Sequence, residues 1–330
     1  MTDLIYHHKF YTNQEPGQNL IIDLERTYID KIILNCKPTD LFINSVWFEY
    51  DDNMERLLAQ KPERIIIYSG YDWDDRGYRK SVHDKIKEHS DNIVYVGNTD
   101  GVGYFSFWLF FVEQNALKYK LDHYSSLPIS KLFMSLNRRC HPHRVSFVKS
   151  LYENNLEEYG YISLGDDPEN TFKPIFLPED VNNEEGDKAS GKMFGISKDI
   201  TSLGNPSYWN NHLINIVTET GVNNNTFISE KTWKPILGLK PFMILGDYKV
   251  YEYLKDYGID TFDDIFGTGY TNKDPKLREK WIIETLYKLK DKNYNDIYHS
   301  ILPRLVKNKD AMSSIYKKNN DRFYTILNNL

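Results

Sequence analysis

Short apolar runs alternate with polar stretches of helical spacing along most of this sequence, and this alternation restricts the fold more than any other feature. In the first 130 residues, the runs expected to form strands are residues 32–35, 41–48, 64–69 and 92–97. The stretches expected to form helices are residues 52–60, 78–90 and 105–119. Strands that alternate with helices of this length form a parallel sheet covered by helices on both faces. The fold class is therefore predicted to be α/β.

A second series of the same kind begins at residue 131 and predicts a second domain. Its expected strands are residues 131–136, 159–164, 213–217 and 241–245, and its helices include residues 143–154 and 229–239. A chain of 330 residues also exceeds the usual size of one domain. We therefore expect two Rossmann-like domains, residues 1–128 and 129–305, followed by a C-terminal helix, residues 306–330, that could cross back to the first domain.

Charge and cysteine content argue against several classes of protein. The net charge of −6 and the lack of a Lys/Arg-rich run give no general attraction to polyanions. Cys36 and Cys140 have no C-x-x-C spacing, so neither a disulfide framework nor a zinc site is indicated. The longest apolar run, residues 104–112, is too short to span a bilayer. These features predict a protein of the reducing cytoplasm that is not bound to a membrane.

The most informative stretch of the sequence reads IVTETGVNNNTFISEKTWKPILGLKPFMILG. It predicts a buried strand that ends at Glu219, a polar loop, and a helix with Ser229 as its N-cap and with Glu230 and Lys231 in its first turn. The free N–H groups of such a turn, with Lys231 beside them, are suited to hold a phosphate, and Glu230 could accept hydrogen bonds from a ribose diol. Helix capping alone would also account for a Ser-Glu pair at this position.

An upstream segment, residues 135–144, reads SLNRRCHPHR and lies where a strand is expected to lead into a helix. Its three arginines and two histidines predict a cationic pocket, because the planar guanidinium group of arginine matches two phosphate oxygens at once. A solvated edge is the alternative for Arg138 or Arg139 alone. The His-Pro-His run could suggest a metal, but apart from Cys140 no ligand stands at a fixed spacing from it.

These motifs resemble the nucleotide-binding region of α1,3-fucosyltransferases. In that family a strand ends in Phe-Glu-Asn, Tyr-Val/Ile-Thr-Glu-Lys opens the next helix, and a Val-Pro-Val strand follows. Here Glu219 matches the first glutamate, residues 227–231 (Phe-Ile-Ser-Glu-Lys) match the helix opening, and residues 240–242 (Lys-Pro-Phe) stand where Val-Pro-Val would. The sequence departs from the family at Thr220, where the family has Asn, and in the Trp-Lys-Pro that continues the motif.

The sequence looks even more like glycosyltransferase-like proteins of bacteriophages and giant viruses, which carry Ser-Glu-Lys-Thr-x-Lys-Pro and an upstream Asn-Arg-x-x-x-x-His-Arg. The resemblance implies a glycosyltransferase of the GT-B type, with two Rossmann-like domains facing across a cleft. It also implies that an Asn-to-Arg element clamps the pyrophosphate, which makes Arg144 the first candidate for that role. The nucleotide-sugar-binding residues expected from it are Asn137, Arg138, Arg144, Glu219, Ser229, Glu230, Lys231 and Thr232.

A catalytic base is expected in the first domain. Its third predicted strand runs into Gly-Tyr-Asp-Trp-Asp-Asp, and a carboxylate at such a strand end could deprotonate an acceptor hydroxyl. Asp72 is the first candidate and Asp74 the second, with Glu49, Asp51 and Asp52 in reserve. The same string could instead be an Asp-x-Asp motif that holds a divalent ion against a diphosphate, or an acidic turn that caps the following helix.

Together these features predict a metal-independent glycosyltransferase that uses a UDP- or GDP-linked sugar as its co-substrate and no other cofactor. The resemblance to fucosyltransferases implies that the reaction inverts the configuration at the anomeric carbon. The acceptor is either a glycan or, given the viral look of the sequence, a hydroxymethylated base in viral DNA, in which case the protein acts in the host cytoplasm. A nucleotide- or glycan-binding module without catalysis is the alternative of another class. Neither the identity of the nucleotide nor the oligomeric state follows from the sequence.

Overall fold

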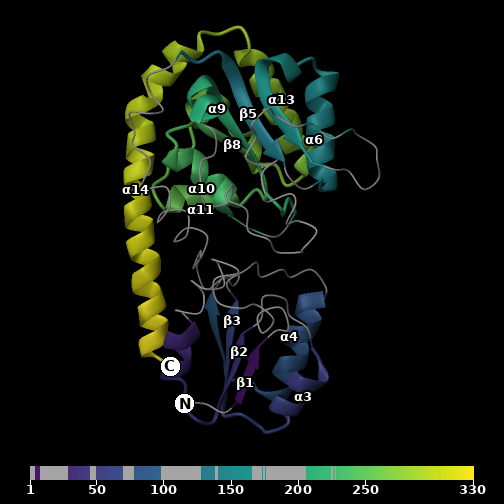
Figure 1. Ribbon diagram of the computed structural model, residues 1–330, viewed down its shortest axis with the longest axis vertical. Coiled ribbons are helices and arrows are strands. Elements are labelled where there is room, and N and C mark those ends of the chain that lie inside the picture. Colours follow the sequence, from purple (N-terminus) through teal and green to yellow (C-terminus); the bar gives the residue numbers. More distant parts are fainter. Residues whose placement is uncertain are drawn as a thin grey trace. The chain divides into compact units, whose positions relative to one another are not determined.

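The computed structural model describes residues 4–7, 29–44, 50–69, 78–97, 128–137, 140–165, 173, 175, 206–223, 226 and 228–330 (Figure 1). The chain divides into two compact units, one of Met1–Phe107 with Tyr316–Leu330 and one of Trp108–Ile315. The described strands form two four-stranded parallel sheets, one in each unit. The α/β fold class is therefore confirmed, whereas the domain boundaries after residues 128 and 305 stay predictions.

The sheet of the first unit has the order β1-β2-β3-β4, and all neighbouring strands are parallel. Its strands are β1 Leu4–His7, β2 Asp40–Asn44, β3 Arg64–Ser69 and β4 Ile93–Gly97, and its helices include α3 Asp52–Leu58 and α4 Tyr78–His89. Isoleucines two positions apart point to the same face of a strand. Ile43, Ile65 and Ile67 accordingly pack with Leu58 of α3 and Ile86 of α4 in one core.

One predicted strand of this unit is wrong. Residues 29–35 form a helix, in which Ile29 and Ile32 are buried while Leu34 is 71% exposed. The buried residues of this segment and the following Cys36 recur every three or four positions, as on one face of a helix. In a run this short, periodicity alone does not distinguish a buried helix from a buried strand. The edge strand β1 is absent from the prediction, because its four residues are too few to show a periodicity.

The sheet of the second unit has the order β6-β5-β7-β8 and is also parallel throughout. Its strands are β5 Lys131–Asn137, β6 Gly160–Leu164, β7 His212–Thr218 and β8 Phe242–Leu245. The helices packed on it include α6 Pro142–Glu153, α9 Pro206–Asn211, α10 Glu230–Leu237 and α13 Pro275–Leu289. All four predicted strands and the helices that follow β5 and β7 are confirmed, to within a few residues at their ends.

Helices cover both faces of this second sheet (Figure 1). On one face α6 and α13 lie side by side, and the hydroxyl groups of Ser146 and Ser150 donate to the carboxylate of Glu279. On the other face α10 packs against α9 so closely that a Cβ atom on Gly238 would meet the Trp209 ring at 2.8 Å. Glycine is therefore required at the C-terminal end of α10 by this close approach.

The strand order of the second sheet reverses at β5. The connection from β5 leads to β6 on one side, and the chain then returns to β7 on the other side of β5. Met134 pairs with Asn215, and the same register places Asn137 beside Thr218 at the carboxyl ends of β5 and β7. Such a switch point leaves a crevice outside the strand ends, and this is where open α/β sheets bind ligands.

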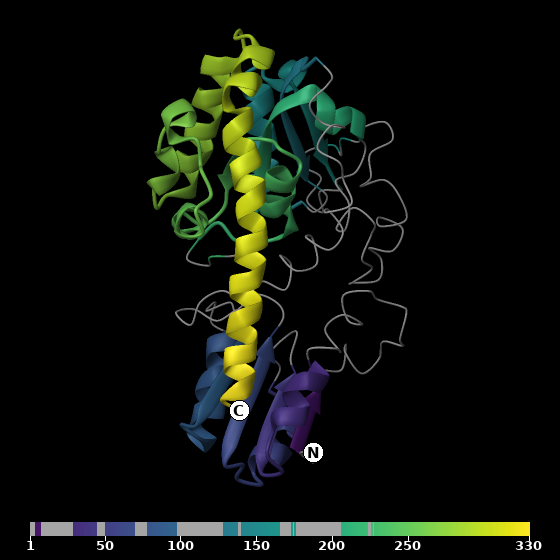
Figure 2. The ribbon, with the colours of Figure 1, turned by 90° about the vertical axis from the view of Figure 1, so that its left-hand side faces the viewer.

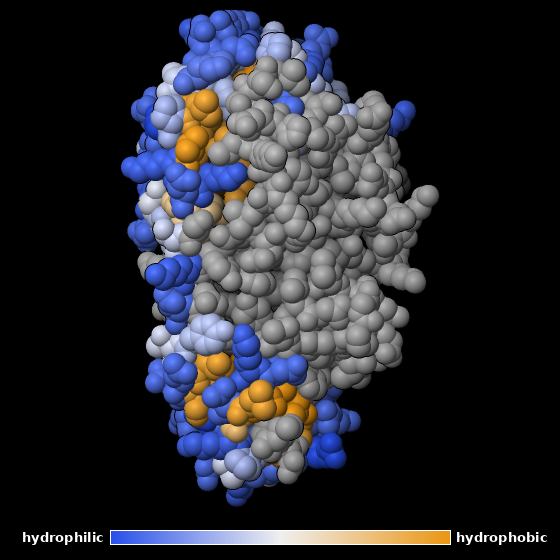
Figure 3. Space-filling model, turned by 60° about the vertical axis from the view of Figure 1, so that its left-hand side comes forward, coloured by the Kyte–Doolittle hydropathy of each residue, from blue (hydrophilic) through white to orange (hydrophobic). Residues whose placement is uncertain are grey.

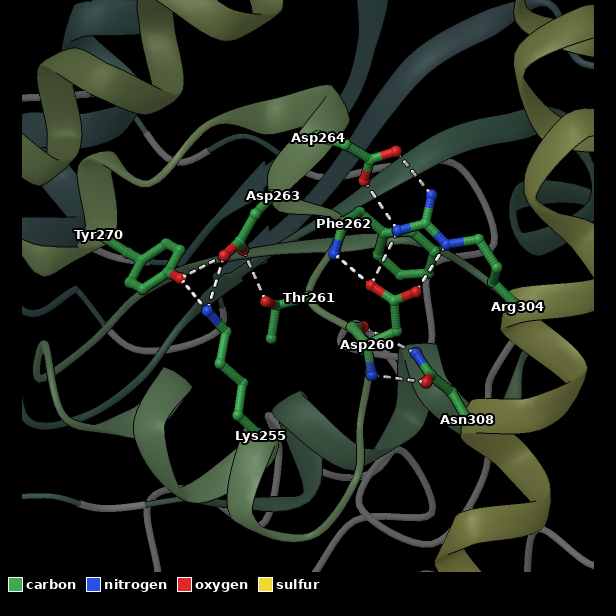
Figure 4. A network of polar contacts seen from close by, with 9 residues as sticks. All are labelled: Lys255, Asp260, Thr261, Phe262, Asp263, Asp264, Tyr270, Arg304 and Asn308. Carbon is green, nitrogen blue, oxygen red and sulfur yellow. Dashed lines mark hydrogen bonds and ion pairs between the residues drawn. The ribbon is translucent and has the colours of Figure 1, made fainter.

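A polar network attaches the last long helix to the second unit (Figure 4). The helices of this region include α11 Val250–Asp256, α12 Asp263–Phe266 and the 3-10 helix η4 Gly269–Thr271. The long helix is α14 Tyr294–Asn328, drawn in yellow in Figure 2. Arg304 of α14 makes two-point contacts with Asp260, at 2.6 and 2.9 Å, and with Asp264, at 2.9 and 2.8 Å. Its guanidinium group lies 4.8 Å from the ring centre of Phe262, whose backbone is left-handed with φ 56°. The network thus holds the turn before α12 against α14.

On the face seen in Figure 3, the described residues are mostly hydrophilic, with separate hydrophobic patches. Among all described residues, the exposed large apolar or aromatic side chains are Leu34, Tyr152, Leu277, Tyr287 and Tyr324. They come from the helix 29–35, α6, α13 and α14. In the described ranges, no helix has both the length and the apolar character needed to cross a membrane.

Candidate functional site

Asn137 and Thr218 join the two strand ends at the switch point of the second sheet. The Thr218 hydroxyl donates to Oδ1 of Asn137 at 2.5 Å. The Asn137 amide nitrogen donates to Oγ of Ser135 at 3.1 Å and to the carbonyl oxygen of Ser163 at 3.1 Å. Both Asn137 and Thr218 are buried, so these bonds hold the carboxyl ends of β5, β6 and β7 together. Asn137 therefore has a structural role, since it connects the strand ends that lie beneath the candidate site.

The first turn of α6 reaches across from the end of β5 to the end of β7. Arg144 is 2% exposed, and its guanidinium group donates to the carbonyl oxygen of Thr218 at 2.9 Å. The neighbouring His143 places Nε2 at 2.8 Å from the carbonyl oxygen of Glu219. The helix can start here because His141 has extended backbone and Pro142, which lacks an N–H, takes the first helical position. Two consecutive side chains thus bind two consecutive carbonyl groups at the end of β7.

The contact with Glu219 fixes the protonation of His143. A carbonyl oxygen only accepts hydrogen bonds, so Nε2 carries the proton and Nδ1 carries the lone pair. Burial and, second, the charge of Arg144 lower the pKa of His143 to about 4, against a smaller opposing effect of the bond to Glu219. The imidazole is consequently neutral at neutral pH, with one nitrogen committed as a donor.

Glu219 links the end of β7 to the start of α10. Its carboxylate is fully buried and accepts from the Ser229 N–H at 2.9 Å, the Ser229 hydroxyl at 2.7 Å and the Thr232 hydroxyl at 2.7 Å. Ser229 caps α10, as predicted, because its Oγ accepts from the Lys231 N–H at 3.2 Å. A carboxylate at a helix N-terminus is stabilised by the helix dipole. The anion at this N-terminus is therefore the protein's own Glu219.

This arrangement changes one expectation from the sequence. The N–H groups of the first turn of this helix were expected to point outward and to hold a phosphate, but those of Lys231 and Thr232 are bonded to Oγ and to the carbonyl oxygen of Ser229. The Lys231 side chain is partly buried, and its ammonium group donates to Oγ of Ser229 at 3.1 Å. The candidate phosphate ligand on α10 is therefore the positively charged side chain of Lys231 and not the N–H groups of the first turn.

Two residues that hold the loop between β7 and α10 were missing from the sequence-based prediction. Asp247, which is 2% exposed, accepts from the Thr226 hydroxyl at 3.1 Å and from the Lys249 N–H at 3.0 Å. Arg278 of α13 is 1% exposed and donates to the carbonyl oxygen of Val222. Glu219 directly follows β7 and Asp247 lies two residues after the end of β8, so the same rule of a carboxylate after a buried strand could have identified Asp247. Nothing local in the sequence marks Arg278.

The structure brings six of the eight predicted nucleotide-sugar ligands into one connected region. They are Asn137, Arg144, Glu219, Ser229, Lys231 and Thr232, linked through the carbonyl and hydroxyl groups of Thr218 and through the Glu219 carboxylate. Arg138 lies outside the described residues. Glu230 is the first residue of α10, and its side chain lies outside the description.

The expected catalytic carboxylates of the first domain fall into two groups. Asp72, Asp74 and Glu49 lie outside the described residues. The reserve candidate Asp51 is the N-cap of α3, where its Oδ1 accepts from the Met54 N–H at 2.9 Å. Asp52 is exposed in the first turn of the same helix. Asp51 therefore caps α3, whereas the acidic turn for which capping was the alternative, residues 70–75, lies outside the described residues.

Neither the described side chains nor known proteins add a further identification. Within the described ranges, no group of three or more His, Cys, Asp or Glu residues could hold a metal ion. Comparison with family models, with curated proteins and with solved structures finds no match. The functional conclusion therefore depends on the motif residues and on the geometry of the switch point.

Proposed function

We propose that this protein is an inverting, metal-independent glycosyltransferase that moves a sugar from a nucleoside-diphosphate sugar to an acceptor hydroxyl. One observation carries the proposal. Two motif segments that lie 81 residues apart, around Asn137 and around Thr218, meet in one hydrogen-bonded region at a topological switch point. That is the place where an open α/β sheet binds a nucleotide.

In this proposal the second unit binds the donor. Lys231, Arg144 and Arg138 supply positive charge for the diphosphate, and this charge stabilises the leaving group as the glycosidic bond breaks. Glu219, Ser229 and Thr232 keep the start of α10 in place, so that Lys231 stays at the edge of the sheet. Asn137 performs the same positioning task for the strand ends. Glu230, one residue before Lys231, accepts from the ribose diol.

In this proposal the first unit binds the acceptor and provides the catalytic base, as in a glycosyltransferase of the GT-B type. Asp72, with Asp74 as the second candidate, takes the proton from the acceptor hydroxyl. The acceptor is a glycan, which suits the net charge of −6 better than DNA does. A hydroxymethylated base of viral DNA is the second candidate, and a module that binds nucleotide or glycan without catalysis is the alternative of another class. The proposed setting is the cytoplasm.

Donor binding is tested first. The melting temperature of the wild type is measured with UDP-, GDP- and CMP-sugars, because a ligand that binds the native state alone raises it. We expect one nucleotide class to raise it, and Lys231→Met to reduce the shift. Lys276→Met, an exposed lysine in the first turn of α13, is the matched control. No shift with any nucleotide sugar would overturn the proposal.

Catalysis is tested second, with the sugar donor that binds. Asp72→Asn and Asp74→Asn are each assayed for transfer to glycan acceptors and to DNA that contains hydroxymethylated bases. We expect one of them to remove turnover while binding of the donor is retained. Donor binding without transfer by the wild type to either acceptor would favour the binding module. Arg144→Lys, which keeps the charge and loses the planar fork, should lower turnover by roughly ten- to a thousandfold.

A further inference from the structure

We propose that His143 is a donor-binding residue whose Nδ1 accepts a hydrogen bond from a hydroxyl group of the nucleotide sugar, while its Nε2–H is committed to the carbonyl oxygen of Glu219. The inference rests on the proposed function, because it names a contact within the same site. His143 is the histidine of the Asn-to-His-Arg segment, and the proposed reaction gives it no role of its own.

The orientation of the ring is determined by two contacts. Nε2 donates to Glu219 O at 2.8 Å, which leaves Nδ1 as the acceptor nitrogen. The ring also stacks on His141, with centroids 5.7 Å apart and planes inclined by 5°. Within the part of the chain that the structure describes, no group donates to Nδ1, and the side chain is only partly buried. The lone pair of Nδ1 thus has a fixed direction on a partly buried side chain.

His143 lies at the switch point, where a bound ligand would be within its reach. His143 belongs to the helix after β5, and its partner Glu219 directly follows β7, so the ring bridges the two strand ends whose order reverses. A ligand bound outside these ends contacts the same edge of the sheet. The neighbouring groups Arg144 and Lys231 are cations suited to phosphate oxygens, whereas a neutral imidazole nitrogen is not.

The chemistry of Nδ1 selects the kind of ligand group. A diphosphate oxygen carries no proton at neutral pH and cannot donate to a lone pair, whereas the hydroxyl groups of a ribose or a sugar can. Burial and the charge of Arg144 hold the pKa of His143 at about 4, so the ring keeps its lone pair over the physiological range. His143 should therefore recognise a hydroxyl next to the diphosphate instead of the diphosphate itself.

Two substitutions separate the two nitrogens. In His143→Gln the amide nitrogen can take the place of Nε2 and keep the bond to Glu219, but no acceptor remains at the Nδ1 position. In His143→Asn the amide oxygen lies near the Nδ1 position, but the side chain is too short to reach Glu219. A purely structural role would make the Asn variant the weaker protein and leave binding by the Gln variant unchanged.

The test is calorimetric titration of wild type and both variants with UDP, UDP-glucose, GDP and GDP-mannose, together with their melting temperatures. We expect the Gln variant to melt close to the wild type and to bind about three- to tenfold more weakly, which is the effect of one lost hydrogen bond. The Asn variant should melt lower and retain more affinity than the Gln variant. If the Gln variant binds both the free nucleotides and the nucleotide sugars more weakly, the partner of Nδ1 is a ribose hydroxyl. If it binds only the nucleotide sugars more weakly, the partner is a hydroxyl of the sugar.

Three results would overturn the inference. Wild-type affinity in the folded Gln variant would show that Nδ1 binds no ligand group, while the proposed function would stand. Tighter binding by the wild type as the pH falls through about 6.5, the ordinary pKa of histidine, would mean that His143 acts as a cation. If the wild type binds none of the four probes or of the wider panel of nucleotide sugars, the proposed function fails and the inference fails with it.

Discussion

The carboxylate of Glu219 accepts hydrogen bonds from both the backbone N–H and the hydroxyl group of Ser229, at 2.9 and 2.7 Å. The negative charge at the N-terminus of α10 is therefore part of the chain, and it comes from the residue that ends the preceding strand. The Ser-Glu-Lys motif therefore has a structural role, because its serine connects the start of α10 to the end of β7 by hydrogen bonds. The N–H groups of Ser229 and Lys231 are bonded within the chain, so the side chain of Lys231 is the adjacent positive group for a phosphate at this site.

Replacing Glu219 by Gln should destabilise the second unit. The amide keeps the shape of the side chain but has one acceptor where the carboxylate has two, and it turns a donor toward Ser229 or Thr232. We expect the free energy of unfolding in urea to fall by about 1.5–3 kcal/mol, the range for hydrogen bonds to a charged group. Glu252→Gln, at an exposed position in the first turn of α11, should change it by less than about 1 kcal/mol. Equal effects of the two substitutions would contradict the role given to Glu219.

His143 should make stability fall in weak acid. Its pKa is about 4 in the folded protein and about 6.5 in an unfolded chain, so between these values the unfolded state binds a proton that the folded state does not. Stability is therefore lost as the pH falls from about 6.5 toward 4. Denaturation in urea at pH 7 and pH 5 should show a smaller loss for His143→Gln than for the wild type. The buried His212, whose pKa is also lowered, contributes in the same direction to both proteins. Identical losses would contradict this account of His143.

Lys240 should make the stability of the folded protein depend on pH above neutrality as well. Its side chain is fully buried, donates to the carbonyl oxygen of His212 at 2.7 Å and lies 4.7 Å from the ring centre of Tyr298. Burial lowers the pKa of Lys240 to about 7, while an unfolded lysine titrates near about 10.4. The unfolded state thus keeps a proton that the folded state has lost, and stability rises as the pH rises between these values.

Lys240→Met tests this dependence, because methionine fills a similar volume without a charge. We expect the gain in stability of the wild type between pH 7 and pH 9.5, measured by urea denaturation, to be reduced in this variant. Lys276→Met, at an exposed site, should leave the gain unchanged. A variant at position 240 with the full wild-type gain would show that other groups are responsible.

Turnover should not depend on a divalent metal, because the proposed site meets the diphosphate with arginine and lysine side chains. The assay compares initial rates of sugar transfer before and after dialysis against EDTA. We expect the rate to change by less than about twofold, since no step of the proposed reaction uses a metal as an electrophile. Loss of activity in EDTA that manganese or magnesium restores would favour the alternative in which Asp72 and Asp74 bind a divalent ion.

The sequence predicted the elements well where the signal was local. The strand at residues 64–69 and the cap Ser229 are observed as predicted, because side-chain periodicity and cap chemistry depend on a few neighbouring residues. The same local signal failed at residues 29–35, where an apolar run too short to show its period was interpreted as a strand. The motif around Glu219 identified the strand end and the helix start on either side of the candidate site.

The sequence by itself thus determined an α/β chain with two series of strands and a candidate motif at a strand end. Only the tertiary structure decided that β5 lies between β6 and β7, because strand order depends on contacts between distant segments and not on local periodicity. That order brings His143 to Glu219, 76 residues away, and commits its Nε2 as a donor. It also turns Glu219 from a ligand candidate into the internal anion of α10, since the carboxylate meets Ser229 only when β7 and α10 pack together.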